Sequence, residues 1–456
     1  MNLFWHRGDL RLRDNRGLAM AASDGDVLPV FVVEDALLRG LGDRQRAFFF
    51  AGLDALRDEY RDRGGDLLVQ RGDPARSLAA VSEQFDADTV YYNRCYQPAR
   101  RNRERRVARR FPTVAATDTV LVDPGDLDPS YPSHSQFHDD WSARPKPDPA
   151  PAPDPARLVD PGEGQSLPSE ETDIDLPAAG YGAARARYDQ FLADGIETYA
   201  DTRDDLSAAV DRPVGAVSRL SPYLASGMIG IREVWGDATD RYESVSGDAR
   251  RNVEKFRYEL TWREANYHLL FNDPGLLSKN HRELANPIAW RDVEGEFERW
   301  QRGETGYPLV DAGMRQLERE GYIHNRPRQV VASFLTKHLL VDWRKGARHF
   351  EDRLVDHDAA VNYGNWQWIA STGTDTVDVR IFDPVAQASK YDPNADYVQE
   401  YVPELREVPP EVVVEWPTLD ASERRRLAPD YPDPLVDRDA AYDRAQRVFE
   451  TALGKR

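Results

Sequence analysis

Short apolar runs alternate with amphipathic stretches along the first 122 residues of the chain. The apolar runs are rich in β-branched and aromatic residues and predict strands at residues 3–5, 27–33, 67–70, 89–93 and 120–122. Helical periodicity predicts helices between them, at residues 43–63, 74–85 and 97–110. Such alternation is typical of parallel pairing, so we expect an α/β domain with a doubly wound, Rossmann-like sheet. No G-x-G-x-x-G follows the first strand, which argues against a standard dinucleotide-binding turn.

The second half of the chain is helical in pattern almost to its end. Helices are predicted at residues 184–194, 231–243, 249–271, 309–320, 327–341, 346–355 and 437–453. We therefore expect an all-α second domain. Tryptophan and arginine are concentrated there, and a helical domain rich in both can enclose a large planar cofactor that carries a pyrophosphate.

A change of composition separates these two halves. Proline occupies every second position from Pro145 to Pro155, and Asp, Ala and Gly surround it. Each proline fixes its own φ and favours an extended predecessor, so this segment is expected to be a semi-rigid linker without core elements. The predicted division is a first domain at 1–124, a linker at 125–183 and a second domain at 184–456.

Charge adds a prediction about the environment. The chain has 60 basic and 79 acidic residues, a formal net charge of −19, and nearly all its basic residues are arginine. An acidic, lysine-poor composition favours a halophilic protein whose hydrated surface stays soluble in a saline cytoplasm, although acidic drift in a G+C-rich genome would also produce it. The acidity argues against nucleic-acid binding by the surface as a whole, but it permits a local basic cleft.

Other classes are excluded by simple counts. The single Cys95 rules out an intramolecular disulfide and an all-cysteine zinc site, and we expect no metal. No leader of charged and then apolar residues opens the chain, and no apolar run is long enough to cross a membrane. We expect a cytoplasmic protein.

The densest basic run is residues 97–110, with arginine at half of its positions. This run is either a nucleic-acid contact or, the interpretation that we favour, a solvated amphipathic helix whose apolar residues face the sheet.

Several longer motifs point to one family. They begin with the N-terminal FWHRGDLRLRDN (4–15) and continue with ELTWRE (259–264), GYPLVDAGMRQL (306–317), HNRPRQ (324–329), LVDWR (340–344), VDHDAAVNYGNWQWIASTGTD (355–375) and YPDPLVD (431–437). In this order and spacing they resemble the photolyase/cryptochrome family, flavoproteins that use blue light. The resemblance covers nearly the whole chain except the linker. It implies an α/β antenna domain, which can hold a second chromophore (a deazaflavin, a folate or a flavin), and an all-α FAD-binding domain.

The resemblance implies a set of FAD-binding residues. The adenosine and phosphates of FAD would be held by Tyr199 and by residues Val217, Ser218, Arg219, Leu220 and Ser221, although the family commonly has threonine where this chain has Val217. Residues expected around the flavin ring are Phe256, Arg263, Asn325, the ion pair Arg328–Asp356, Asp358 and Asn362. Asn362 would face flavin N5, where an amide tunes protonation without adding charge, so we also class it as catalytic.

The resemblance implies two further groups of residues. Trp366, Trp343 and Trp290 match the family's electron-transfer chain from flavin to surface, and Trp300 is a nearby competitor for the last position. Residues expected to bind a pyrimidine dimer in DNA are Arg203, Glu259, Trp262, Arg326, Gln329, Trp368 and Gln387. A carboxyl group on the pyrimidine edge and an indole on its face are the usual means of reading an extruded base; photolyases are a standard example of base flipping.

The chain departs from the bacterial dimer photolyases at two positions. Gln329 stands where they usually have methionine, and Tyr363-Gly-Asn365 stands where they usually have Asn-Gly-Gly; both features resemble cryptochromes of the DASH type. The (6-4) photolyases carry histidines at the positions of Asn325 and Gln329, which argues against (6-4) repair. The resemblance favours a cyclobutane pyrimidine dimer photolyase, a light-driven lyase acting on UV-damaged DNA as a monomer. A photoreceptor, DASH-like or signalling without repair, is the alternative.

Overall fold

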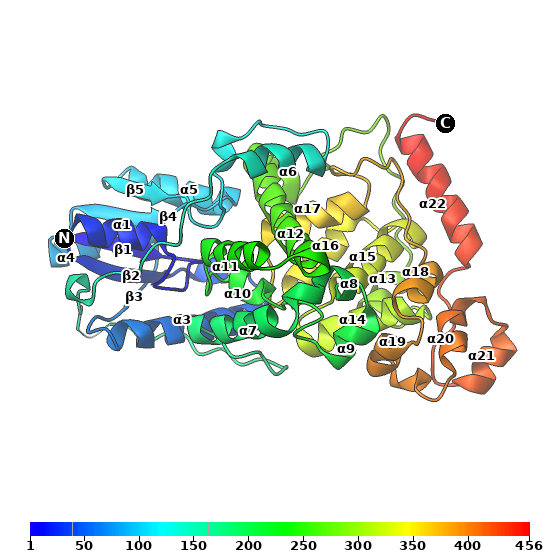
Figure 1. Cartoon of the computed structure of the whole chain (residues 1–456). Helices are drawn as coiled ribbons and strands as arrows, with labels where there is room; N and C mark the ends of the chain where they lie inside the picture. Colours follow the sequence, from blue (N-terminus) through cyan, green and yellow to red (C-terminus); the bar gives the residue numbers. More distant parts are fainter. Residues whose placement is uncertain (39, 163) are drawn as a thin grey trace.

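The computed structural model describes residues 1–38, 40–162 and 164–456. Its N-terminal part is a five-stranded, fully parallel sheet in the order β3-β2-β1-β4-β5, and the helical part lies beside it (Figure 1). The strands are β1 Asn2–His6, β2 Val27–Val33, β3 Leu68–Arg71, β4 Thr89–Asn93 and β5 Thr113–Ala116. The chain winds outward from β1 in both directions, so the prediction of a doubly wound sheet is confirmed.

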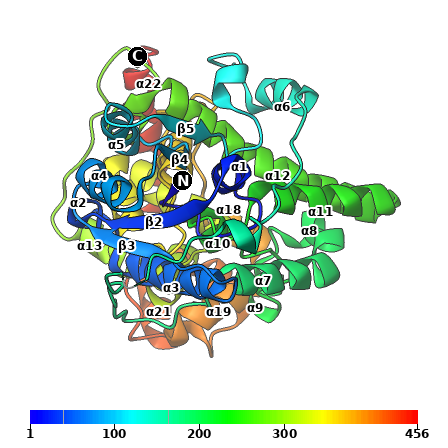
Figure 2. The same ribbon diagram turned by 90° about the vertical axis from the view of Figure 1, so that its left-hand side faces the viewer.

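Helices cover both faces of this sheet (Figure 2). They are α1 Arg16–Asp24, α2 Asp35–Leu38, α3 Asp43–Arg61, α4 Pro74–Phe85 and α5 Pro98–Ala108. Side chains of β1 alternate between two cores: Phe4 packs in the cluster that contains Phe48 of α3, and Leu3 packs in the cluster that contains Leu78 of α4. Burial on both faces explains why the strands read as continuous apolar runs.

The prediction of a strand at residues 120–122 is wrong. Val120, Leu121 and Val122 are buried but form bends, and the last strand, β5, lies earlier in the chain. The amides of Leu121 and Val122 donate to the Glu264 carboxylate, at 3.0 and 3.4 Å, instead of to a neighbouring strand. The apolar run therefore serves the contact between the two parts of the molecule.

The basic run forms α5, as predicted. Val107 packs in the core beside the sheet, and Arg105 and Arg106 are exposed, as expected for a solvated helix. Arg103 and Arg106 form ion pairs with Glu34 and Asp73.

The linker contains a core element that the composition did not predict. Residues 134–143 form α6 (His134–Ala143), in which Phe137 is 3% and Trp141 0% exposed. The Trp141 indole donates to Glu264 at 3.2 Å, which fixes α6 to the helical part. The reason is local: Ser133 caps the helix, and aromatic residues four apart share the face turned inward. The alternating prolines from 145 to 153 are without helix or strand, as expected.

The remainder of the chain is helical, as predicted. Its α-helices are α7 Tyr181–Asp194, α8 Tyr199–Thr202, α9 Leu206–Asp211, α10 Ser221–Ala225, α11 Ile231–Ser244, α12 Gly247–Asn272, α13 Glu296–Gln301, α14 Pro308–Glu320, α15 Asn325–Ser333, α16 Trp343–Arg353, α17 Ala359–Ile369, α18 Pro384–Tyr391, α19 Asp396–Tyr401, α20 Pro410–Val414, α21 Ala421–Leu427 and α22 Arg438–Ala452. Short 3-10 turns lie at Pro124–Asp126, Pro155–Arg157, Ile196–Thr198, Pro274–Leu277, Pro403–Leu405 and Trp416–Thr418. The predicted helix 327–341 is shorter, because α15 passes into a π-helical turn, Phe334–His338.

A buried ionic network joins the two parts. Arg232 of α11 is 2.5 Å from Asp14 and 2.6 Å from Asp118, and Arg11 is 2.5 Å from Asp118. All four side chains are almost completely buried. Because each charge has an opposite partner, the network fixes the relative position of sheet and helices without an isolated buried charge.

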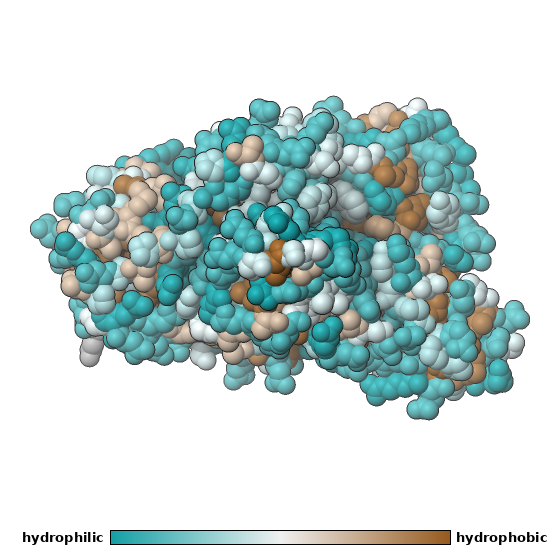
Figure 3. Space-filling view, viewed as in Figure 1, coloured by the Kyte–Doolittle hydropathy of each residue, from teal (hydrophilic) through white to brown (hydrophobic). Residues whose placement is uncertain are grey.

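The outer surface agrees with the composition. The face in Figure 3 is mainly hydrophilic, with small separate hydrophobic areas. Among the described residues, no helix has both the length and the hydropathy needed to cross a membrane.

Candidate functional site

The long helix α12 carries the first group of predicted site residues. Glu259 and Trp262 lie three positions apart, so both side chains emerge from one face of the helix. The Glu259 carboxylate is paired with the guanidinium of Arg203, at the end of α8, and with the ammonium of Lys255 at 2.7 Å. Two cations thus hold a partly exposed carboxylate in one orientation.

A second group comes from the start of α15. Arg326 is 2.8 Å from Asp204, donates to Gln329 at 2.9 Å and lies over the Tyr391 ring at 4.1 Å. Since Asp204 also lies 3.7 Å from Arg203, the two groups are continuous. We call Arg203, Asp204, Glu259, Trp262, Arg326 and Gln329 the polar rim. Asn325 is exposed at the first position of α15.

His324 caps α15 and so sets the direction of the rim. Its Nδ1 accepts from the Arg326 amide at 3.3 Å, and this requires a neutral ring with an unprotonated Nδ1. Burial lowers the pKa of His324 to about 3, which keeps the ring neutral at ordinary pH.

The predicted pair Arg328–Asp356 is present. The guanidinium lies 3.1 Å from the Asp356 carboxylate and also contacts the Ile323 carbonyl at 3.3 Å. Asp356 is 6% exposed, so the acidic member of the pair is buried. Asn362, on α17, is also 6% exposed, and its amide nitrogen donates to the Ala347 carbonyl at 2.9 Å, which leaves the side-chain oxygen as an acceptor.

Asp358 has a structural task beside the predicted one. Its carboxylate caps α17 by accepting from the amides of Ala360 and Val361, at 2.9 and 3.2 Å, and it accepts from the Tyr267 hydroxyl. Arg263 lies over the Tyr267 ring at 4.7 Å and donates to the Thr119 carbonyl at 2.8 Å. Both residues therefore stand where α12, α17 and the sheet domain meet.

The segment predicted for FAD phosphates lies between α9 and α10. Val217, Ser218, Arg219 and Ser221 are half-buried and Leu220 is 2% exposed. Arg219 adopts a positive φ of 48°, which turns its guanidinium onto Tyr322 at 4.3 Å and toward Glu320 at 2.7 Å. Tyr199 packs edge-on against Phe256 at 5.5 Å, and burial raises the pKa of its phenol, so it stays a hydroxyl.

These residues fit an anionic planar cofactor. The guanidinium of Arg219 and the hydroxyls of Ser218 and Ser221 form a donor set suited to a pyrophosphate. In the described part of the chain, several buried polar atoms near this segment and the rim have no hydrogen-bond partner: Nε of Arg203, Arg219 and Arg326, Nε2 of His324, Oδ1 of Asp204 and Oε1 of Gln387. Buried polar groups are normally paired, so these atoms indicate a polar ligand.

The predicted tryptophan chain runs from interior to surface. Trp366 is 3% exposed, Trp343 is 0% exposed and Trp290 is half-buried. Gly346 allows Trp366 to approach α16, because a Cβ there would meet the Trp366 ring at 2.2 Å. Trp343 lies one helical turn before Gly346, so two tryptophans of the predicted chain, Trp343 and Trp366, lie at the first turn of α16.

The surroundings of these indoles add two features. Trp366 also contacts Trp300 edge-on at 6.2 Å, so Trp300 belongs to the interior of this cluster and not to its surface end. Trp343 donates to Asn280 at 3.1 Å and packs on Tyr363 at 6.2 Å, while Trp290 packs on Phe449 of α22 at 6.0 Å. Trp368 has a different neighbour from the three tryptophans of the predicted chain: the guanidinium of Arg380 lies over its ring at 4.7 Å.

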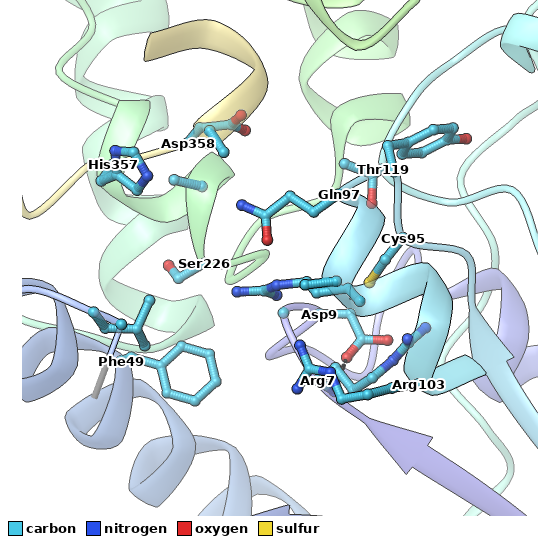
Figure 4. Close-up of a pocket in the computed structure, with 18 of the residues that line it drawn as sticks. Arg7, Asp9, Phe49, Cys95, Gln97, Arg103, Thr119, Ser226, His357 and Asp358 are labelled. Carbon is cyan, nitrogen blue, oxygen red and sulfur yellow. Dashed lines mark hydrogen bonds between the residues drawn. The ribbon is translucent and has the colours of Figure 1, made fainter. Parts of the chain in front are cut away.

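A large cavity lies between the sheet domain and the helical domain and is lined by residues of both. It has a volume of about 600 Å³ and lies at the carboxyl ends of β1, β2 and β4 (Figure 4). Arg7, Gln97 and Arg103 enter it from the sheet side, and Ser226, His357 and Asp358 enter from the helical side. We call it the interdomain cavity; it is the crevice where open α/β sheets bind ligands.

Unpaired polar atoms gather in the interdomain cavity as well. Within the described residues, Oε1 of Gln45, Oη of Tyr96, Nε of Arg100 and both ring nitrogens of His357 are buried without a hydrogen-bond partner. Burial lowers the pKa of His357 and raises the pKa of the Cys95 thiol, so the ring and the thiol are neutral. The cavity therefore suits a planar ligand with several polar atoms.

Sequence reasoning missed the cavity and the contact of α6 with the rim. The cavity residues come from strand ends, α3, α5 and several segments of the helical domain. Some of them, such as Arg7 and His357, lie in the motifs 4–15 and 355–375, but nothing in the sequence shows that these motifs meet. The contact of α6 had a signal: His134 follows a capping serine and precedes an aromatic pair at helical spacing.

Comparisons with known proteins agree with this arrangement. One family model, described as DNA photolyase, matches residues 2–156, and another, described as FAD binding domain of DNA photolyase, matches residues 256–451. The deoxyribodipyrimidine photo-lyase of Halobacterium salinarum is 42% identical over 486 residues, covering 100% of both chains. This relative supports the halophilic interpretation of the composition.

Solved structures extend the similarity to the whole fold. A cryptochrome of Synechocystis superposes with a TM-score of 0.89 at 28% identity, covering 98% of this chain and 99% of that one. An archaeal photolyase of Sulfolobus tokodaii, solved with two FAD molecules, superposes with a TM-score of 0.82 at 30% identity, covering 99% and 100%. With both family models matched and a relative similar from end to end, the chain belongs to the DNA photolyase family.

Proposed function

We propose that this protein repairs cyclobutane pyrimidine dimers in DNA, using light and FAD. The observation that carries the proposal is the pair Glu259–Trp262 on one face of α12, with the carboxylate oriented by Arg203 and Lys255. A carboxylate beside a half-buried indole can bind the edge and the face of one extruded pyrimidine. The curated relatives bear the name of a dimer lyase, which supports the same reaction.

The rim would bind DNA in spite of the acidic surface. Arg203, Lys255 and Arg326 provide local positive charge next to the pair that reads the base. Phosphate binding depends on the charges that touch phosphate and not on the net charge, so a small basic rim suffices. Gln329, held by Arg326, would present its amide to the lesion.

FAD would be held by Tyr199, the 217–221 segment, Arg263 and the Arg328–Asp356 pair. The chemistry that bound FAD would supply, when fully reduced and excited by light, is the donation of one electron to the dimer and its recovery after the ring opens. Residues of the chain would orient FAD and shield it from water. Asn362 offers it an uncharged amide, and the buried carboxylate of Asp356 is neutralised by Arg328. The tryptophans Trp366, Trp343 and Trp290 would carry an electron inward from the surface when FAD must first be reduced.

The interdomain cavity would hold a second, light-gathering chromophore: a deazaflavin, a folate or a flavin. Arginine and glutamine side chains and unpaired polar atoms line it, which suits a planar heterocycle with anionic or carbonyl groups. The Sulfolobus relative solved with two FAD molecules supports a flavin in particular. Soaking the purified protein with each candidate, followed by its absorption spectrum after desalting, identifies the chromophore.

A photoreceptor without repair is the second candidate. The fold similarity to a Synechocystis cryptochrome and the residues Gln329 and Tyr363 favour it. The retained Glu259 and Trp262 favour repair, because a signalling protein has no need of a base-reading pair. Action as a cytoplasmic monomer stays a prediction.

The test is repair of oligonucleotides that carry one thymine dimer. FAD-reconstituted, reduced protein is illuminated with single- and double-stranded substrates over a range of salt concentrations, since phosphate contacts weaken as salt rises. Repair of both substrates is the expected result. Repair of single strands alone indicates a DASH-like enzyme, and absence of repair with FAD bound and photoreducible indicates a photoreceptor.

A further inference from the structure

The linker helix α6 places a histidine flat against the indole of the polar rim. The rings of His134 and Trp262 are 3.5 Å apart between centroids and inclined by only 5°. α6 and α12 lie side by side in both views of the ribbon (Figures 1 and 2). An imidazole this close and this parallel occupies one face of the indole.

His134 is held in this position by α12 itself. Its Nδ1 lies 3.0 Å from the Tyr258 hydroxyl, and its Nε2 lies 3.2 Å from the Thr261 hydroxyl. With both ring nitrogens engaged, the imidazole is fixed in plane as well as in place. Since Tyr258, Thr261 and Trp262 belong to one helix, the imidazole moves with the indole that it covers.

The helix that carries His134 is equally well anchored. Trp141 donates to the buried Glu264, and Phe137 packs against His268 at 5.4 Å, both partners belonging to α12. Burial lowers the pKa of His134 to about 4, so the ring is neutral at ordinary pH and no ionic repulsion from Lys255 loosens it. The stack is therefore a fixed part of the fold.

Trp262 depends on this contact for its orientation. Among the described residues, its indole nitrogen forms no hydrogen bond, and His134 is its only aromatic neighbour. Glu259, by contrast, is oriented by two cations. Of the two residues Glu259 and Trp262, the first is thus oriented by ion pairs and the second has His134 as its stacking partner.

We propose that His134 is a positioning residue for the damaged base: it covers one face of Trp262, fixes the plane of that indole and leaves the opposite face for the extruded pyrimidine. The inference rests on the proposed function, because it names a third element of the same lesion site. It assigns the linker a role in substrate binding. A base stacked on a pre-oriented ring loses less entropy on binding than one stacked on a mobile ring.

The test separates stacking from hydrogen bonding at this position. H134F keeps a flat ring and loses the two hydrogen bonds, H134N keeps a polar group and loses the ring, and H134A loses both. The control is H138A, one turn along the same helix, where the ring contacts Thr261 at 3.3 Å and lies 4.9 Å from Tyr258. The variants are compared as FAD-loaded protein, in the dark, by their affinities for dimer-containing and undamaged oligonucleotides.

We expect H134A and H134N to bind the dimer about 2- to 10-fold more weakly, the worth of one aromatic pair. H134F and H138A should retain wild-type affinity. Affinity for undamaged DNA and repair per absorbed photon at saturating substrate should not change, because neither phosphate contacts nor the reacting groups are altered.

If wild-type protein binds dimer DNA more tightly than undamaged DNA, either of two results would overturn the inference. One is unchanged or tighter dimer binding by H134A, which would make His134 a bystander or an obstacle. The other is rescue by H134N and not by H134F, which would reduce His134 to a hydrogen-bonding support of α6. If wild-type protein shows no preference for dimer DNA, the proposed function fails first, and this outcome is seen without any variant.

Discussion

The polar rim and the interdomain cavity are both candidate binding sites, but they are built in different ways. The rim takes two residues each from the end of α8, from α12 and from α15, so each contribution is a short stretch of sequence. The cavity takes its residues from segments far apart in the sequence: three strand ends, α3, α5, and helices and loops of the helical domain. A site made of helical turns keeps its geometry when one residue changes, whereas a site between domains depends on how the domains are joined. The difference suggests that the rim fixes the chemistry and that the cavity can adapt to the available chromophore.

The largest expected effect concerns the rim. Replacing Glu259 and Trp262 together with alanine removes a base-stacking indole, worth about 1–3 kcal/mol, and a carboxylate acceptor, worth about 1–2 kcal/mol. Affinity for dimer DNA should fall at least about 30-fold, to the level of undamaged DNA. The measurement is a binding titration with both oligonucleotides. Retained preference for the dimer in a variant with normal FAD content would show that the lesion binds elsewhere.

The tryptophan chain gives the next prediction. Trp343→Phe should block photoreduction of bound FAD, because the buried link between Trp366 and the surface is lost, while chemically reduced enzyme still repairs. Absorption spectra during blue illumination measure the first property, and repair after dithionite reduction measures the second. Trp416→Phe is the matched control, a fully buried tryptophan that packs on Tyr431 outside the chain. Equal photoreduction in both variants would remove the chain.

The interdomain cavity predicts an effect confined to the second chromophore. Arg100 has a buried Nε without a partner among the described residues and lines the cavity, so Arg100→Ala removes a donor available to a ligand. Affinity for the second chromophore should fall about 5- to 30-fold, while FAD content and repair under direct FAD excitation stay unchanged. Arg105→Ala, exposed on the same helix, is the control. Loss of repair in the Arg100 variant would contradict the separation of the two sites.

The smallest effect concerns pH and the cap of α15. His324 has a pKa of about 3 in the folded protein against 6.5 as a free side chain, so between these values only the unfolded chain binds its proton. Its stabilising contribution is complete above pH 6.5 and is lost as pH falls toward 3. The His324→Asn variant keeps a capping side chain without this titration.

The two proteins should therefore diverge in acid. The free energy of unfolding of wild-type protein should fall more steeply with decreasing pH than that of His324→Asn, by at most about 1.4 kcal/mol per pH unit. The difference is measured by denaturant titrations of FAD-loaded protein between about pH 7.5 and about pH 5.5. This range spans the ordinary histidine pKa of about 6.5. Parallel curves would show that folding does not lower the pKa of His324.

The features that the sequence predicted correctly are those determined by neighbouring residues or by a single motif. The first four strands, the helical second half and the pairs Arg328–Asp356 and Glu259–Trp262 each follow from residues close in sequence or from a motif. The run 120–122 misled because its apolar residues are buried against α12, and its amides are satisfied by a side chain, Glu264, that lies 143 residues away from Leu121. Apolar composition predicts burial but not the partner that satisfies the backbone.

The linker shows the opposite error. Its proline content concealed α6, where Ser133, Phe137 and Trp141 carry ordinary helix signals. The interdomain cavity lay beyond sequence reasoning altogether, because residues such as Gln97 and His357 become neighbours only when the two domains meet. Long-range sites of this kind require the fold.

The most direct test of the central claim is light-dependent repair by the rim. A single-dimer oligonucleotide is incubated with reduced, FAD-loaded wild-type protein and with the Glu259→Ala, Trp262→Ala double variant, in blue light and in darkness. Restored thymines are expected only for wild-type protein in light. Repair by the double variant, or no repair by photoreducible wild-type protein, would contradict it.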